Sequence, residues 1–180
     1  MRKRKDYKDI TWIYGLVSKA PEDPRFYEDY AVRKVFKMTP AEYYLMEKHE
    51  KEHIGCKRNP DGTSKFGTIG GGHVVKFYLN EDWSYEVVSE CHGCGEILNL
   101  TEEAKKLEGE KIPEEYVKKS QIYGGGTLGE VEYYRLWYFM RGHKGHKVSV
   151  GFMGTGLGYL IVVQDEDIKE RADITDTSNW

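Results

Sequence analysis

The sequence predicts an α+β protein, in which a mostly antiparallel β-sheet is accompanied by a few short helices. Two runs of strand-like residues, His73–Leu79 and Trp83–Val88, flank the polar residues 80–82, and this order is typical of a β-hairpin. Further strand-like segments follow the three glycines at 124–126. Helices are indicated by capping residues, of which the clearest stand immediately before Pro40.

The first forty residues predict one strand, one short helix and a second strand. The apolar run Thr11–Val17 is typical of a buried strand, and residues 21–24 contain the prolines of a turn. Asp23 is suited to cap a helix whose first turn contains Pro24. We expect this helix to be short and to be followed by a strand over Val32–Lys37.

A longer helix is predicted from a capping box. Thr39 provides the cap, Pro40 suits the first helical position, and Glu42 stands where its side chain can reach back to the cap. We expect this helix to run to about His53. The stretch 57–72 is rich in glycine and small polar residues, and it predicts a long loop before the hairpin.

Two charged segments predict short helices between the hairpin and the glycines at 124–126. They are Thr101–Glu108 and Pro113–Ser120, and each opens with acidic residues that favour a helix N-terminus. The glycines mark the best boundary in the chain. We therefore expect an N-terminal α+β region of residues 1–123 and a β-rich region of residues 124–180, which share one core.

The last third of the chain is interpreted as strands. We expect strands over Glu130–Met140, Lys147–Phe152 and Tyr159–Val163, with glycine-rich turns between them. A polar tail is expected from Gln164 onwards.

All three cysteines of the chain stand in two short turns. Cys56 follows His53 by three positions, and Cys94 follows Cys91 by three positions. Two ligands with this spacing can reach one ion from a tight turn, and two such turns supply four tetrahedral ligands. The sequence thus predicts a structural zinc site of three thiolates and one imidazole. Such a site is closed, because no coordination position is left for water.

The segment Cys91–Gly95 has the pattern Cys-x-x-Cys-Gly and resembles the zinc knuckle of the zinc-ribbon and treble-clef families. In such a turn, backbone amides can point at a ligand sulfur, and the glycine tolerates the left-handed conformation. The resemblance covers residues 53–95, roughly a quarter of the chain. It implies a zinc-stapled β-hairpin module packed with the rest of the sheet. His53 stands where these families usually have cysteine, so His49 and His92 stay open as alternatives for the fourth ligand.

A competing motif overlaps the first turn. His49-Glu50-Lys51-Glu52-His53 matches the His-Glu-x-x-His pattern of zinc metalloproteases, in which two histidines one helical turn apart hold zinc and the glutamate polarises a water. His73 is a possible third ligand. The two residues between the histidines are charged, whereas they are usually apolar in these enzymes, and His53 cannot readily serve both sites. A zinc-dependent hydrolase is therefore kept as the alternative function. For these residues themselves, a charged helix face exposed to solvent is favoured over a catalytic zinc site.

The segment Tyr133–Lys147 interleaves aromatic and basic side chains, as do surfaces that bind single-stranded nucleic acid. As a strand it would be apolar on both faces and central in a sheet, with its basic end exposed. The net charge of −3 means that the chain has no overall positive charge to attract nucleic acid, so a protein partner is slightly favoured over a nucleic-acid partner. The side chains expected to meet the partner are Arg135, Trp137, Arg141, His143, Lys144 and Lys147.

Composition bounds the remaining possibilities. The chain is 39% hydrophobic and 32% charged, which suits a globular protein, and it has no apolar run that could cross a bilayer. Residues 1–9 form a charged lead-in that is expected to be partly disordered. Three cysteines are an odd number, which argues against a disulfide framework and for a reducing, cytoplasmic location. The sequence therefore predicts a non-catalytic zinc-binding interaction protein.

Overall fold

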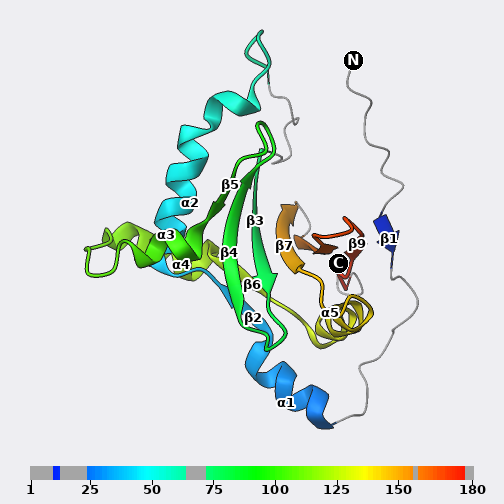
Figure 1. Ribbon diagram of the computed structural model, residues 1–180. Coiled ribbons are helices and arrows are strands. Elements are labelled where there is room, and N and C mark those ends of the chain that lie inside the picture. The colour runs from blue at the N-terminus through cyan, green and yellow to red at the C-terminus, as the bar shows by residue number, and fades with distance from the viewer. Residues whose placement is uncertain (1–9, 13–23, 64–71, 156–157, 177–180) are drawn as a thin grey trace.

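The computed structural model describes residues 10–12, 24–63, 72–155 and 158–176, and these form a mixed α+β fold (Figure 1). Seven strands of the described chain form one sheet in the order β1-β9-β8-β7-β3-β4-β5. The pair β1–β9 is parallel and the other neighbours are antiparallel. The strands are β1 Ile10–Trp12, β3 His73–Leu79, β4 Tyr85–Cys91, β5 Ile97–Asn99, β7 Val148–Thr155, β8 Gly158–Asp165 and β9 Arg171–Asp173.

A short antiparallel ribbon and the helices surround this sheet. The ribbon pairs β2, Val35–Lys37, with β6, Gly125–Thr127. The helices are α1 Pro24–Arg33, α2 Pro40–Glu52, α3 Leu100–Lys105, α4 Glu114–Tyr123 and α5 Glu130–Gly142, with a 3-10 turn, η2, at Ile54–Lys57. Among the described residues, no helix is long and apolar enough to cross a membrane.

The predicted hairpin is confirmed. Strands β3 and β4 pair along their whole length, from Leu79 opposite Tyr85 to His73 opposite Cys91. The turn between them places Trp83 at a positive φ of 66°, where a bulky side chain is strained. Its indole stacks on Tyr133 of α5, with ring centroids 5.0 Å apart. This contact ties the hairpin turn to a helix far along the chain.

The predicted capping box is also confirmed, and it fixes the start of α2. The Thr39 side chain accepts a hydrogen bond from the Glu42 amide at 3.2 Å, and the Glu42 carboxylate accepts one from the Thr39 amide at 2.7 Å. Glu42 is buried and also accepts a hydrogen bond from the Thr101 hydroxyl at 2.6 Å, which joins α2 to α3. The two short helices expected after the hairpin correspond to α3 and α4, with shifted ends.

The strand expected over Glu130–Met140 is wrong, because this segment forms helix α5. The Glu132 carboxylate accepts a hydrogen bond from the Gly129 amide at 2.8 Å, and two glutamates stand in the first turn, which favours a helix N-terminus. From Tyr133 to Met140 every residue except Arg135 is apolar or aromatic, so this part of the run suits both periods, and packing selects the helix. The buried apolar side chains recur every three residues, at Tyr133, Leu136 and Phe139, and Arg135 is the buried charged residue of the helix.

Two other expectations are wrong in part. Helix α1 extends to Arg33, so the strand expected over Val32–Lys37 is confined to β2. The polar tail expected from Gln164 instead continues β8 and then forms β9, which adds a strand to the sheet. The expectations for residues 1–9, 13–17, 21–23 and 64–71 fall outside the described residues.

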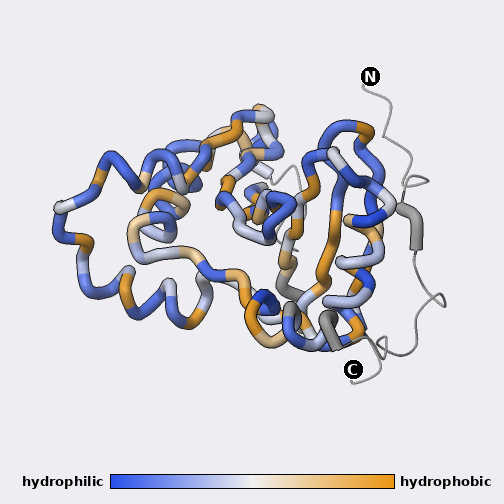
Figure 2. The backbone as a smooth tube through the Cα atoms, turned by 60° about the horizontal axis from the view of Figure 1, so that its bottom comes forward, coloured by the Kyte–Doolittle hydropathy of each residue, from blue (hydrophilic) through white to orange (hydrophobic). Residues whose placement is uncertain are grey.

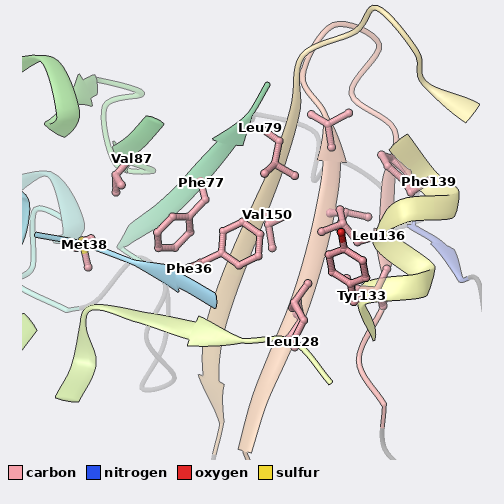
Figure 3. Packing of buried hydrophobic residues seen from close by; sticks show 14 of the residues in the cluster. Phe36, Met38, Phe77, Leu79, Val87, Leu128, Tyr133, Leu136, Phe139 and Val150 are labelled. Carbon is pink, nitrogen blue, oxygen red and sulfur yellow. The ribbon is translucent and has the colours of Figure 1, made fainter. Parts of the chain in front are cut away.

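The buried cluster joins residues from before and after the glycines at 124–126. Phe36 of β2 packs on Phe77 of β3, with ring centroids 5.4 Å apart, and Val150 of β7 is fully buried beside them. In Figure 3, Phe36 and Phe77 face each other, while Tyr133 and Leu136 point from α5 towards the sheet. Figure 2 shows long hydrophobic stretches along the central strands, whereas the peripheral helices and loops alternate in hydropathy.

Candidate metal centre

The structure brings the four predicted ligands together at the open end of the hairpin. His53 caps the C-terminus of α2 and Cys56 lies in η2, while Cys91 ends β4 and Cys94 lies in the turn beyond it. One ligand atom from each of these residues lies within 4.8 Å of all the others. In Figure 1 the C-terminal end of α2 lies beside this end of the hairpin.

Two distances between candidate ligand atoms are close to those of a tetrahedral zinc centre. With zinc–sulfur bonds near 2.3 Å and zinc–nitrogen bonds near 2.05 Å, sulfur and nitrogen ligands are about 3.6 Å apart across a tetrahedron. The Nδ1 atom of His53 lies 3.7 Å from the Cys56 sulfur and 3.3 Å from the Cys94 sulfur. The residues present therefore fit the ion in donor type and in size.

The turn after β4 has the features expected of a metal-binding knuckle. The Gly95 amide donates to the Cys91 carbonyl at 2.7 Å, and the Cys91 amide donates to the Glu96 carbonyl at 2.8 Å. Gly95 has a φ of 82°, in the left-handed region that glycine adopts at low cost. The amides of Gly93 and Cys94 point at the Cys91 sulfur, and the Glu96 amide points at the Cys94 sulfur.

These contacts act on the ionisation of the thiols. Burial alone would raise the pKa of Cys91, but hydrogen bonds from two backbone amides and the neighbouring thiols lower the pKa of Cys91 overall. At Cys94, the Glu96 amide alone would lower the pKa, yet desolvation and the adjacent thiols raise the pKa of Cys94 overall. Crowded thiols resist full ionisation unless a cation compensates their charge, so this donor set suits a thiolate-bound metal.

Gly93 allows the two turns to touch. A Cβ atom at Gly93 would lie 2.3 Å from the carbonyl oxygen of Cys56 and 2.7 Å from the Cβ of Cys56. Real Cβ atoms essentially never approach so closely, and the nearest obstacle is backbone that cannot rotate away. The close approach of Cys56 to the second turn therefore requires glycine at position 93.

Glu96 adjoins the candidate centre and was not among the predicted ligands. Its carboxylate lies 3.5 Å from Nε2 of His53, on the side of the ring away from the thiols. A histidine that binds metal through one nitrogen commonly donates its other N–H to a carboxylate, which orients the ring. The available signal was the acidic residue directly after Cys-x-x-Cys-Gly.

The two alternative fourth ligands lie elsewhere. His49 is 2% exposed, and its Nδ1 atom is within hydrogen-bond distance of the Ser89 hydroxyl, at 3.0 Å, and of His73 Nε2, at 3.1 Å. His92 is exposed, with its Nε2 atom 3.9 Å from the Glu90 carboxylate. His53 is the histidine that lies among the three thiols.

The two histidines of the His-Glu-x-x-His motif, His49 and His53, also lie in a second group of potential metal ligands. Ligand atoms of His49, His53 and Glu96 lie within 4.8 Å of one another, so Glu96 rather than His73 completes this second group. The Nε2 atom of His49 is buried and has no hydrogen-bond partner among the described residues. Glu50, the candidate base, is exposed on α2. His53 belongs to both groups.

Four of the six side chains expected to meet a partner line one groove of about 260 Å³. The groove lies between the β3–β4 turn and the C-terminal end of α5, and Figure 1 shows these two elements side by side. Trp83 and Trp137 both line it. The four expected residues are Trp137, Arg141, His143 and Lys144.

The other two expected side chains are engaged elsewhere. Arg135 is 8% exposed, and its guanidinium donates to the carbonyls of Ile174 and Thr175 at 3.1 and 2.6 Å. Residues two apart on a helix point about 200° apart, so Arg135 faces away from Trp137, contrary to the strand interpretation. Lys147 lies with its ammonium 4.1 Å from the centroid of the Tyr78 ring.

A histidine–aspartate pair adjoins the groove. Nδ1 of His146 lies 2.6 Å from the carboxylate of Asp165, which is fully buried. This hydrogen bond raises the pKa of His146. Burial alone would raise the pKa of Asp165, but the hydrogen bonds from His146 and from two backbone amides lower the pKa of Asp165 overall.

Comparison with known proteins found no match to a protein-family model, to a curated protein or to a solved structure.

Proposed function

We propose that this chain is a non-catalytic zinc-binding interaction protein, in which one structural zinc ion is held by His53, Cys56, Cys91 and Cys94. The observation that carries the proposal is the convergence of three thiols and one imidazole, from two separate segments, to within 4.8 Å. Thiolate and imidazole are the ligands that zinc prefers in structural sites.

The ion would act as a staple between a helix and a hairpin. His53 and Cys56 follow α2, and Cys91 and Cys94 follow β4, so a shared ion joins the end of α2 to the end of the hairpin. This arrangement supports a zinc-ribbon-like module, packed with the rest of the antiparallel sheet. Four protein ligands leave no position for water, so the ion stabilises structure and does not activate a nucleophile.

The interaction role is supported by the groove beside α5. It combines two tryptophans with the cationic side chains of Arg141 and Lys144. Tryptophan and arginine are enriched where proteins bind partners, because they present large contact areas and several hydrogen-bond donors.

Metal analysis of the protein purified under reducing conditions tests the zinc half of the proposal. We expect one zinc per chain, and we expect Cys91→Ser to lose it and to lower the unfolding temperature. Substitution by cobalt(II) adds a spectroscopic readout, because thiolate-to-metal charge-transfer bands report sulfur ligands and strong visible bands report tetrahedral geometry. Protein without stoichiometric metal, or a Cys91→Ser variant that folds and binds metal normally, would refute it.

A zinc-dependent hydrolase is a second candidate, favoured by the grouping of His49, His53 and Glu96 beside the exposed Glu50. In that case the metal keeps a water ligand that the carboxylate of Glu50 polarises. The two candidates differ in which variants lose metal. A structural site predicts that His49→Ala retains zinc while Cys94→Ser loses it, and the hydrolase predicts the reverse.

A further inference from the structure

We propose that the groove between the β3–β4 turn and the C-terminal end of α5 binds single-stranded nucleic acid, with bases stacking on its tryptophans and phosphates meeting Arg141 and Lys144. This inference rests on the proposed function, because it names the partner of the same interaction protein. It differs from the sequence-based preference for a protein partner.

The aromatic part of the groove is held by the fold. Trp83 is stacked on Tyr133 despite its strained backbone, and the groove therefore has an indole fixed at the hairpin turn. Trp137 of α5 also lines the groove, with the centroid of its ring 5.8 Å from that of Tyr134 and 4.6 Å from the Arg141 guanidinium. Bases stack on such rings without sequence preference, since every base has a flat π-face.

The cationic part of the groove is not neutralised by the protein. In the described part of the chain, neither Arg141 nor Lys144 forms an ion pair with a carboxylate. Lysines elsewhere are paired at short range: Lys76 with Glu166 at 3.0 Å, Lys118 with Glu114 at 2.9 Å, and Lys119 with Glu47 at 2.8 Å. Two cations that have no carboxylate partner among the described residues, at one groove of a net acidic chain, favour an anionic ligand.

The acidic groups near the groove are mostly covered by histidines. Asp165 is paired with His146 at 2.6 Å, and the Glu170 carboxylate lies 3.4 Å from Nε2 of His143. Glu81 is the carboxylate that lines the groove itself, from the hairpin turn. A phosphate can therefore approach Arg141 and Lys144 from the α5 side.

The combination of rings and cations favours a nucleotide chain over an acidic peptide. A peptide of acidic side chains would satisfy the cations but would bring no flat group to stack on the indoles. A nucleotide chain alternates flat bases with phosphates, and a groove of about 260 Å³ is at the small end for a ligand site, which suits one base and its phosphate at a time.

Fluorescence anisotropy of the purified 180-residue chain, supplied with zinc, with labelled oligothymidylate and oligouridylate tests the proposal. Oligonucleotides of about 12 nucleotides suit the site sizes of single-strand binders. We expect binding at low salt that weakens as salt is added. Trp137→Ala should weaken it about tenfold or more, and Arg141→Gln should weaken it and reduce the salt slope by about one. Lys118→Ala, on the exposed face of α4, is the matched control and should bind as the parent does.

Three results would overturn the proposal: no oligonucleotide binding at low salt, equal binding by Trp137→Ala and the parent, or tighter binding of polyglutamate than of either oligonucleotide. Zinc content is measured on the same samples. Zinc-loaded protein that does not bind oligonucleotide refutes the groove alone, whereas oligonucleotide binding by protein that never contains zinc refutes the metal half of the proposed function alone.

Discussion

Replacing Gly93 by alanine tests the metal centre without removing any ligand. The added Cβ would lie 2.3 Å from the Cys56 carbonyl oxygen, whereas ordinary contact begins at 3.4 Å, so the two turns must separate by about 1.1 Å. Ligand distances in metal sites tolerate only about 0.2 Å. We therefore expect zinc affinity to fall about 100-fold, equivalent to about 2.7 kcal/mol of metal-linked stability when zinc is in excess.

The assay is competition for zinc with a chelator of known affinity, followed by thermal unfolding with and without zinc. Gly55→Ala is the matched control, because it adds the same methyl group to the other turn, where nothing lies within 4 Å. We expect the Gly55 variant to bind zinc normally and the Gly93 variant to lose most of its zinc-dependent stabilisation. Equal zinc affinity in the two variants would show that the close contact between the two turns is not required for metal binding.

Three further outcomes are expected. Glu96→Gln should weaken zinc binding about tenfold in the same chelator competition, because His53 loses an orienting carboxylate; unchanged affinity would contradict that role. The pair of His146 and Asp165 should stabilise the fold most between the ordinary pKa values of 3.8 and 6.5, because the pKa of Asp165 is lowered and the pKa of His146 is raised. That stabilisation is lost as pH falls through the folded pKa of Asp165 or rises through that of His146, and urea unfolding of Asp165→Asn across pH should show a flatter profile. Arg135→Leu should lower the free energy of unfolding by about 2–4 kcal/mol, because the buried carbonyls of Ile174 and Thr175 lose a charged donor. A loss below about 0.5 kcal/mol in urea unfolding would show that these carbonyls find other hydrogen-bond partners.

Zinc and the buried core would stabilise different ends of the hairpin. At the turn end, Trp83 stacks on Tyr133 of α5, and at the open end, His73 pairs with Cys91 of the candidate metal centre. Beneath the centre, His49 of α2 contacts Ser89 of β4 through buried polar atoms. Metal removal is therefore expected to loosen the end of α2 and the open end of the hairpin before it affects the aromatic core, which hydrogen exchange would resolve.

The features that could be predicted were those with a local cause. The capping box predicts the helix after Thr39, and two strand-like runs around a short turn predict the hairpin. The predicted ligands also needed only local spacing, since each turn contributes a pair separated by two residues. Their assignment to zinc stays a prediction, although the four side chains do converge.

The capped helix, the hairpin and the two turns that contain the candidate ligands follow from local sequence, because each depends on residues a few positions apart. The helical state of the aromatic run after Gly129 depends on packing, because residues 133–140 are apolar or aromatic except at Arg135 and fit two periods, and the sheet selects which face is buried. Only the tertiary structure placed Arg135 under the C-terminal segment and Glu96 beside His53. Such contacts join residues distant in the chain, and no local spacing encodes them.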